Sequence, residues 1–271
     1  MSHNLLKGKR GIIFGALDPN SIAWKVAQRC HAEGAVFTLT NAPVAMRLGA
    51  INQLAAECDA KVIAADVTIN ADMENLIDQS CDILRGKLDF VLHSVGMSLN
   101  IRKGKAYNEL DYEFMKKTLD ISSISLHRLL QSCMKKDAIN EWGSVVALTY
   151  IASQRVFPDY NEMADAKSLL ESIARSYGYH YGKKNKVRIN TISQSPTKTT
   201  AGSGVKGFDG FFDYANAMSP LGNASAEACA DYCVSMFSDL TRMVTMQNLF
   251  HDGGFSFTGV SAEVMDKFMT K

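Results

Sequence analysis

The sequence lacks the features that mark several classes of protein. Among its 271 residues there is no apolar run near the length of about 18 that suggests a membrane-spanning helix, and no internal repeat. The chain also has no large excess of one charge, because 29 Lys and Arg nearly balance 28 Asp and Glu to give a net charge of +1. We therefore expect neither a nucleic acid nor a membrane as partner.

Cysteines are few and lack metal-binding spacing. There are six, none in a CxxC pair, and only Cys229 and Cys233 are placed to share a helix face. Two thiolates make a poor metal site, so packing in the core is favoured and no metal is expected. The chain enters a predicted strand within about ten residues, which leaves no room for a targeting peptide. Together these observations indicate a reduced, cytoplasmic enzyme.

Hydrophobic patterning alternates between strands and helices along the chain. Predicted strands cover 10–15, 36–40, 62–65, 88–96, 143–149, 187–193 and 244–251, and predicted helices cover 21–34, 45–57, 70–84, 111–135, 160–181 and 225–238. This alternation predicts one α/β domain spanning 1–271, with a doubly wound parallel sheet of about seven strands and helices on both faces. In such Rossmann-type folds ligands bind outside the carboxyl ends of the strands.

The turn after the first predicted strand is the candidate phosphate site, although it lacks two of the three glycines of a GxGxxG motif. It reads GALDPNSIA, starting at Gly15. A pyrophosphate needs helix N-terminal N–H groups and a hydroxyl more than three glycines, and Ser21 and Ile22 open the following helix. We expect these three residues to bind the cofactor.

Two further strand ends complete the expected cradle. Asp66 and Val67 follow the third strand and can hold the adenine edge. Ser94, Val95 and Gly96 follow the fourth strand, where a glycine lets the backbone approach the ribose and nicotinamide.

Residues after the second strand bear on the choice between NADH and NADPH. NAD sites commonly carry an acidic residue there, but residues 40–43 read Thr-Asn-Ala-Pro. Arg47 can meet a 2′-phosphate, yet a single arginine at the start of a helix is more often a solvated charge. NADH is favoured, and NADPH stays open.

The stretch 143–168 is the centre of the predicted active site. A buried strand ends at Tyr150, and the predicted helix carries Tyr160 and Lys167 on one face, about two turns apart. Two phenols and an ammonium can converge there on a cofactor and a carbonyl oxygen. A tyrosine, or a Tyr/Lys pair, is usually structural by itself, but the combination after a fifth parallel strand favours catalysis.

At this point the sequence resembles a known family, the NADH-dependent enoyl-acyl-carrier-protein reductases of bacterial fatty acid synthesis. These are a divergent branch of the short-chain dehydrogenase/reductases. The likeness rests on the Y-x9-Y-x6-K pattern from Tyr150, GALDPNSIA, HSVG, LDISSIS, SPTKTTAGSGVK and HDGGFS, and spans about residues 8–256. It implies reduction of the C2–C3 double bond of carrier-linked enoyl chains by a homotetramer.

The spacing has its own chemical interpretation. The wider fold carries Y-x3-K, with a serine about 13 residues before the tyrosine. In this chain Lys167 stands 17 residues after Tyr150, the same interval that separates the serine from the lysine in that pattern. Tyr150 therefore occupies the place of the serine, and we interpret Tyr160 as moved back by nearly one helical turn. An enoyl thioester develops its negative charge further from the hydride acceptor than a ketone does, and a donor shifted by roughly 5 Å suits it.

Roles for the three residues follow as hypotheses. Tyr160 stabilises the enolate, Lys167 holds the nicotinamide ribose and supplies positive charge, and Tyr150 shapes the substrate pocket. The alternatives are a carbonyl (3-ketoacyl) reductase of the same fold and a dinucleotide-sensing protein without activity.

The resemblance also implies contacts beyond the three catalytic residues. Thr197, Thr199 and Ala201 are expected to contact the cofactor, and Ser98 the substrate. The stretch 195–220 combines glycines with aromatic residues, including Phe208, as expected of a lid that closes over an acyl chain.

The chain departs from the family pattern in three places. SQSP at 193–196 replaces SAGP, and Ala42 stands where glutamine is frequent. The basic cluster for the carrier is reduced to Lys206, followed by Asp209, with Lys198 as a substitute. Carrier docking is predicted at these two lysines.

Overall fold

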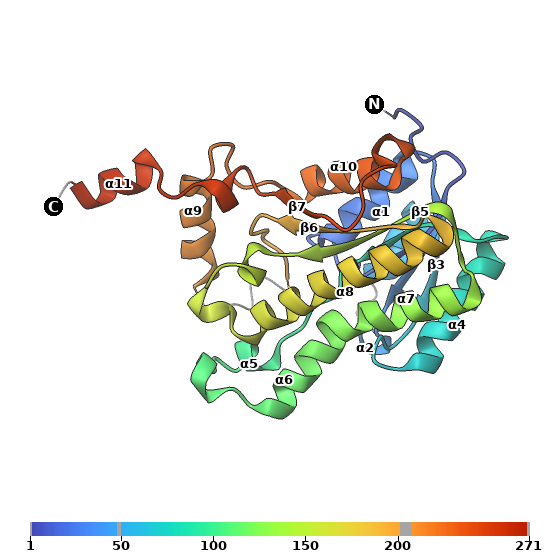
Figure 1. Cartoon of the computed structure of the whole chain (residues 1–271), viewed down its shortest axis with the longest axis horizontal. Coiled ribbons are helices and arrows are strands. Elements are labelled where there is room, and N and C mark those ends of the chain that lie inside the picture. The colour runs from blue at the N-terminus through green and yellow to red at the C-terminus, as the bar shows by residue number, and fades with distance from the viewer. Residues whose placement is uncertain (1, 48–49, 201–206, 270–271) are drawn as a thin grey trace.

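The computed structural model describes residues 2–47, 50–200 and 207–269. It contains a seven-stranded parallel sheet in the order β3-β2-β1-β4-β5-β6-β7 (Figure 1). The strands are β1 (Arg10–Phe14), β2 (Val36–Asn41), β3 (Lys61–Ala64), β4 (Leu88–His93), β5 (Ile139–Thr149), β6 (Arg188–Gln194) and β7 (Asn248–His251). The predicted fold class is confirmed. Within the described ranges no helix is both long and apolar enough to span a bilayer.

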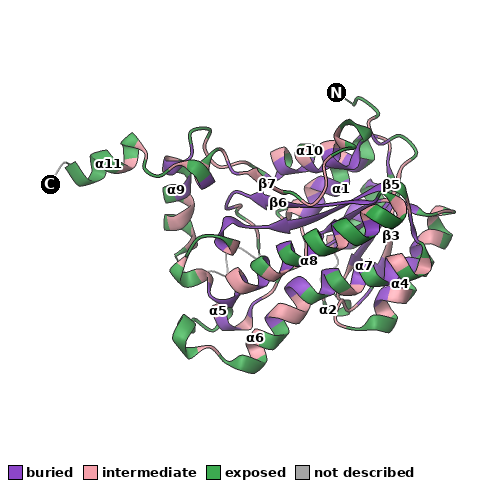
Figure 2. Ribbon diagram, viewed as in Figure 1, coloured by how far each residue is buried: buried purple, intermediate pink, exposed green. Residues whose placement is uncertain are grey.

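Helices cover both faces of the sheet because successive strand residues point to opposite sides. In β1, Ile13 enters the core beneath α1 (Ile22–Ala32), α3 (Ala50–Glu57) and α10 (Ala226–Phe237). Ile12 and Phe14 enter the other core, under α4 (Asn70–Leu84), α7 (Ser125–Lys136) and α8 (Glu162–Asn185). Figure 2 shows the sheet buried between these layers. Cys229 and Cys233 of α10 are fully buried, which confirms their packing role.

The long helix predicted over 111–135 is interrupted. It consists of α6 (Tyr112–Leu119), a π-helical turn (Asp120–Ile124) and α7. The Ser125 hydroxyl donates to the Ile121 carbonyl oxygen at 2.6 Å, and the Ser123 hydroxyl donates to the Ala166 carbonyl oxygen at 2.5 Å. Serines that bond to the backbone favour such local departures from the α-helix, and π turns are frequent at functional sites.

Several short elements were not predicted. They are α2 (Pro43–Met46), α5 (Leu99–Arg102), α9 (Phe208–Met218), α11 (Ala262–Met269) and the 3₁₀ turns Tyr107–Glu109, Ile151–Ser153, Pro158–Tyr160, Asp239–Thr241 and Phe255–Phe257. Most lie at or beyond the carboxyl ends of the strands. There α5 and α9 flank the same end of the molecule, and α11 extends away from it (Figure 1).

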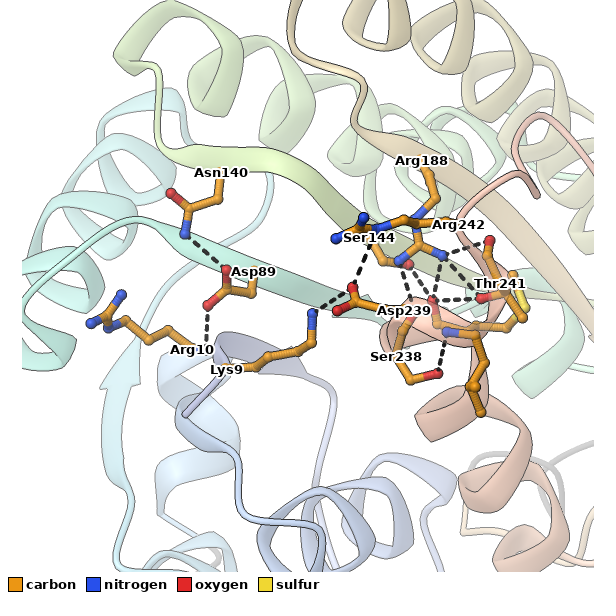
Figure 3. Close-up of polar contacts among 12 residues, drawn as sticks. Lys9, Arg10, Asp89, Asn140, Ser144, Arg188, Ser238, Asp239, Thr241 and Arg242 are labelled. Carbon is orange, nitrogen blue, oxygen red and sulfur yellow. Dashed lines mark hydrogen bonds and ion pairs between the residues drawn. The ribbon is translucent and has the colours of Figure 1, made fainter. Parts of the chain in front are cut away.

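The amino edge of the sheet is closed by a polar network (Figure 3). Arg188 is buried, and its guanidinium donates to the carbonyl oxygens of Met236, Ser238 and Thr241 at 2.9–3.2 Å. Nearby, Asp89 accepts from the Arg10 backbone N–H at 2.8 Å. These contacts hold the amino ends of the strands together. The expected ligand site lies at the other, carboxyl ends of the strands.

Candidate active site

Three neighbouring strands, β1, β4 and β5, bring the predicted site residues together at their carboxyl ends. Gly15 follows β1 with a φ of +92°, and a Cβ there would lie 1.9 Å from the Ser94 carbonyl oxygen. Only glycine fits this position, because any side chain would collide with the backbone after β4. The predicted segments at 15 and 94–96 therefore pack directly against each other.

Tyr150 and Tyr160 meet within a cluster of aromatic rings. Their ring centroids are 5.1 Å apart, and Phe157 lies 5.4 Å from Tyr150. Phe211 of α9 approaches Tyr150 edge-on at 6.4 Å. Tyr150 is buried, and its hydroxyl forms no hydrogen bond with a described residue. The predicted convergence of the two phenols is thus present.

The backbone at Tyr160 differs from the prediction. Tyr160 ends a 3₁₀ turn begun by Pro158, and α8 starts only at Glu162. Between them Asn161 has a φ of +45° and a ψ of −141°, a positive-φ conformation outside the left-handed helical region that is strained for a residue with a side chain. The placement of Tyr160 on the helix, one turn before the usual tyrosine, is therefore wrong. A proline turn and a reversal of φ set its position instead.

Lys167 lies in the second turn of α8 and is almost fully buried, with 8% of its surface exposed. Its ammonium donates to the Leu148 carbonyl oxygen at 2.9 Å. A Cβ on Gly96 would be 3.8 Å from the same nitrogen. Lys167 thus lies between the end of β5 and the glycine after β4, where the ribose was predicted.

Burial changes the acid–base properties of this centre. It raises the pKa of both Tyr150 and Tyr160 well above the usual range of a phenol, so both stay protonated donors. It lowers the pKa of Lys167 to about 8, an effect that Glu171 partly opposes. His93, on β4, is held neutral because burial and the Lys167 charge lower its pKa to about 3. His93 is therefore no proton donor near neutral pH.

The turn between β1 and α1 faces the segment after β6. Thr200 donates to the Asp18 carboxylate at 2.5 Å, which brings the predicted cofactor segment 15–22 together with residues 197–200. Ser21 is the N-cap residue of α1, but its hydroxyl donates to the Asp18 carbonyl oxygen at 2.6 Å. The predicted phosphate donors are thus the free N–H groups of the first helical turn, at Ile22, rather than this hydroxyl.

Asp66 and Val67 are partly committed to local contacts. One Asp66 carboxylate oxygen accepts from the Thr68 backbone N–H and hydroxyl, at 2.9 and 2.7 Å. The Val67 carbonyl accepts from Arg128 at 2.9 Å. The second Asp66 oxygen appears in neither contact, so an adenine-edge contact there stays a prediction.

The predicted lid is only partly described. Thr197 donates to the Ser195 carbonyl oxygen at 3.0 Å, and its own carbonyl accepts from the Thr199 N–H at 2.8 Å. The predicted cofactor residue Ala201 and the predicted docking residue Lys206 lie outside the described residues.

Within α9, the aromatic residue at the tyrosine cluster is not the one predicted. The ring centroids of Phe208 and Phe212 are 6.1 Å apart, whereas the Phe211 ring packs against the rings of Tyr150 and Phe157. Phe211 and Phe212 are three and four residues after Phe208 and flank it on either side of the helix surface, so the composition of the lid could not distinguish which ring reaches the tyrosines.

The departure SQSP has a structural explanation. Gln194 is buried and accepts from His251 Nδ1 at 2.7 Å, while its amide donates to the Ala224 carbonyl oxygen at 2.9 Å. The amide of Gln194 therefore ties β6 to β7 and to the loop before α10. The residue that replaces alanine thus serves this network, and its amide also donates to the Thr197 hydroxyl at 3.4 Å.

Glu162 is a residue that the sequence analysis missed. It is fully buried at the start of α8, and its Oε1 accepts from Ser98, Thr118 and Asn100 at 2.7, 3.0 and 3.2 Å. Ser98, the predicted substrate residue, also caps α5 by accepting from the Ile101 N–H. One carboxylate thus joins the loop after β4, α6 and the residue two positions after Tyr160.

Comparisons with known proteins identify the family. The family model described as "Enoyl-(Acyl carrier protein) reductase" matches residues 15–256. The chain belongs to this family. A curated member, enoyl-acyl-carrier-protein reductase (NADH) 2 of Rhizobium meliloti, is 31% identical over 95% of both chains.

Two solved enoyl-acyl-carrier-protein reductase structures are also similar to this chain. The FabI–NADH complex from Alistipes finegoldii has a TM-score of 0.96 and 60% identity, covering 97% of this chain and 93% of that one. The Bacillus cereus enzyme with NADP⁺ and indole naphthyridinone has a TM-score of 0.88 and 27% identity, covering 96% and 100%.

The lowered pKa of Lys167 predicts a pH-dependent contribution to stability. Above about pH 8 the native chain releases this proton, while the unfolded chain keeps it to near 10.5. The free energy of unfolding of the wild type, relative to Lys167→Met, should therefore rise from about pH 8 to about pH 10. Urea unfolding of both proteins across this range measures the difference, and a difference independent of pH would contradict the assignment.

Proposed function

We propose that this protein is an enoyl-acyl-carrier-protein reductase of fatty acid synthesis, which reduces trans-2-enoyl thioesters to saturated acyl thioesters. The proposal is carried by the meeting of the buried Tyr150 and the half-buried Tyr160, at the same carboxyl ends of the strands where Lys167 is buried on the Leu148 carbonyl. Family membership and the 60% identity to an NADH complex support it. NADH is the proposed cofactor, and NADPH is the alternative to test.

The residues present fit a dinucleotide. Gly15 packs against the Ser94 carbonyl, so no side chain covers the backbone at the end of β1. The first turn of α1 offers N–H groups to a pyrophosphate. Gly96 leaves the Lys167 ammonium accessible to a ribose. We propose that Ser21, Val95 and residues 197–201 border the same cofactor. When bound, NADH supplies a hydride to C3 of the enoyl group.

The chain's own residues then act on the thioester. The Tyr160 hydroxyl donates a hydrogen bond to the thioester oxygen and stabilises the negative charge that develops there. Transfer of this proton to the enolate completes the reduction at C2, and a proton from solvent restores the phenol. The Tyr150 hydroxyl, buried without a described partner, is a second donor beside it. Lys167 orients the ribose and, charged below about pH 8, favours the developing anion. The aromatic cluster with Phe157 and Phe211 excludes water from this reaction.

The remaining parts of the proposal concern the assembly. We propose that the chain is one catalytic domain, with 195–220 as a substrate lid whose Phe211 already contacts the tyrosine cluster. Acyl carrier protein is the proposed donor of the substrate. By its family resemblance, the protein is proposed to act as a homotetramer in the cytoplasm.

Wild-type turnover gives the first test. We expect NADH to be oxidised with a crotonyl thioester and not with an acetoacetyl thioester, because the chain belongs to the enoyl reductase family. Loss of nicotinamide absorbance, with NADH and NADPH offered separately, measures this. Turnover with the acetoacetyl thioester alone would identify a carbonyl reductase, and NADH binding without turnover would identify a sensing protein.

Removing the Tyr160 hydroxyl should lower kcat by about 100-fold or more, because it donates to the charge of the transition state. A matched control is Tyr181→Phe, since Tyr181 is fully buried farther along α8 and does not belong to the aromatic cluster of Tyr150 and Tyr160. Steady-state kinetics should show a normal rate for that control. Equal rates in Tyr160→Phe and Tyr181→Phe would remove Tyr160 from the mechanism.

Glu162 is expected to act as a positioning residue for the substrate. Glu162→Leu leaves Ser98, Asn100 and Thr118 without their acceptor, so the KM for the enoyl thioester should rise roughly tenfold or more while that for NADH changes little. Glu162→Gln retains an acceptor and should restore most of the loss.

The control for Glu162 is Glu33→Leu. Glu33 is also a fully buried carboxylate, but it accepts from the His3 and Leu5 N–H groups, away from the site. Thermal unfolding should show a loss of stability in both leucine variants, and only Glu162→Leu should change KM. A stability loss in Glu162→Leu with unchanged KM would make its role purely structural.

A further inference from the structure

A group of exposed cations adjoins the active site, and the functional assignment has given it no role. Arg102, Lys103 and Lys105 lie in and just after α5, with Gly104 between them at a φ of +63°. We call residues 102–105 the basic turn. None of its three cations forms an ion pair with a described residue, and the Lys103 ammonium lies 4.5 Å from the centroid of the Phe114 ring.

Acidic residues occur nearby, but their contacts are directed elsewhere. Asp111 accepts from the Glu113 and Phe114 N–H groups at the start of α6. Glu113 pairs with Lys116 at 2.6 Å, and Asp165 accepts from the Tyr107 hydroxyl at 3.2 Å. The donors of the basic turn are therefore available to an external carboxylate, which an arginine can bind through two parallel hydrogen bonds.

The basic turn is joined to the catalytic residues by short bonds. The Lys105 carbonyl oxygen accepts from Asn161 Nδ2 at 2.6 Å, and Asn161 directly follows Tyr160. On its other side, α5 is capped by Ser98, which donates to Glu162. A partner bound at residues 102–105 would thus lie next to the segment that holds the proposed proton donor.

Lys198, one of the two lysines predicted to dock the carrier, is already engaged. Lys198, on the lid side, lies 3.6 Å from Asp209 and 4.7 Å from the centroid of the Phe212 ring. Figure 1 places α5 and α9 at the same end, beyond the strands. Of these described cations, those of the basic turn have no such carboxylate partner.

We propose that the basic turn is the docking site of the acyl carrier protein and binds an acidic patch on its surface. The inference rests on the proposed function, since a thioester carried on a protein has to be presented beside the site. Arg102 supplies a planar fork for a carboxylate, and Lys103 and Lys105 supply point charges. Such rim charges act mainly on encounter and on the affinity for the carrier, rather than on the chemical step.

The test is the triple variant Arg102→Glu/Lys103→Glu/Lys105→Glu. Its KM for crotonyl-acyl-carrier protein should rise about tenfold or more at low salt, because like charges now face the carrier. Its kcat, and its KM for crotonyl-coenzyme A, should stay near those of the wild type. In the wild type, added salt should raise the KM for the carrier-linked substrate, because it screens exposed charges.

The matched control reverses three exposed cations at the opposite edge of the sheet, Lys7→Glu/Lys61→Glu/Arg85→Glu. These residues lie before β1, at the start of β3 and before β4, and form no ion pair with a described residue. The net charge changes equally in both triple variants. An equal rise of KM for carrier in both would show a general charge effect and overturn the docking site, as would no rise in either.

Binding without turnover separates this inference from the proposed function. Titration of the two triple variants and the wild type with butyryl-acyl-carrier protein reports docking even if no enoyl thioester is reduced. We expect the dissociation constant to rise about tenfold only for the variant of the basic turn. Unchanged affinity in that variant would overturn the proposal, whatever the activity of the wild type.

Discussion

The Lys167 ammonium is held 2.9 Å from the Leu148 carbonyl oxygen, although the side chain is almost fully buried. A buried charge is costly unless it is hydrogen-bonded, so this contact fixes how α8 lies on the end of β5. Leu148 is two residues before Tyr150. The same bond thus sets the distance between the ammonium and the strand-end phenol, and Gly96 closes the third side.

Around this centre, two buried carboxylates of α8 bind the loop segments that follow β4 and β5, which are not held by the hydrogen bonds of the sheet. Glu171, on α8, accepts from the Thr149 hydroxyl at 2.8 Å and from the Ser153 hydroxyl, one residue before and three after Tyr150. Glu162 does the same for the loop after β4. Both carboxylates belong to one helix, so α8 organises the cofactor side and the substrate side together.

Much of this arrangement was predictable from the sequence. Short apolar runs that end in Gly15, Gly96 or Tyr150 predicted the strands, because buried parallel strands are nearly continuous in hydrophobicity. The environment of Tyr160 was not predictable, because its position depends on the backbone of Asn161 and on a bond to Lys105, which is distant in sequence. The roles of Phe211 and Glu162 could not be predicted for the same reason, because they depend on contacts with residues that are distant in sequence.

The positive φ of Asn161 has a mechanical consequence. Tyr160 is not part of the hydrogen-bonded ladder of α8, so its position is not set by the stiffness of that helix. Instead, a single side-chain bond connects the adjacent residue to the Lys105 carbonyl. Because the acceptor is the Lys105 backbone carbonyl and not its side chain, the path of the chain after α5, rather than the charge at residue 105, holds Asn161 in place.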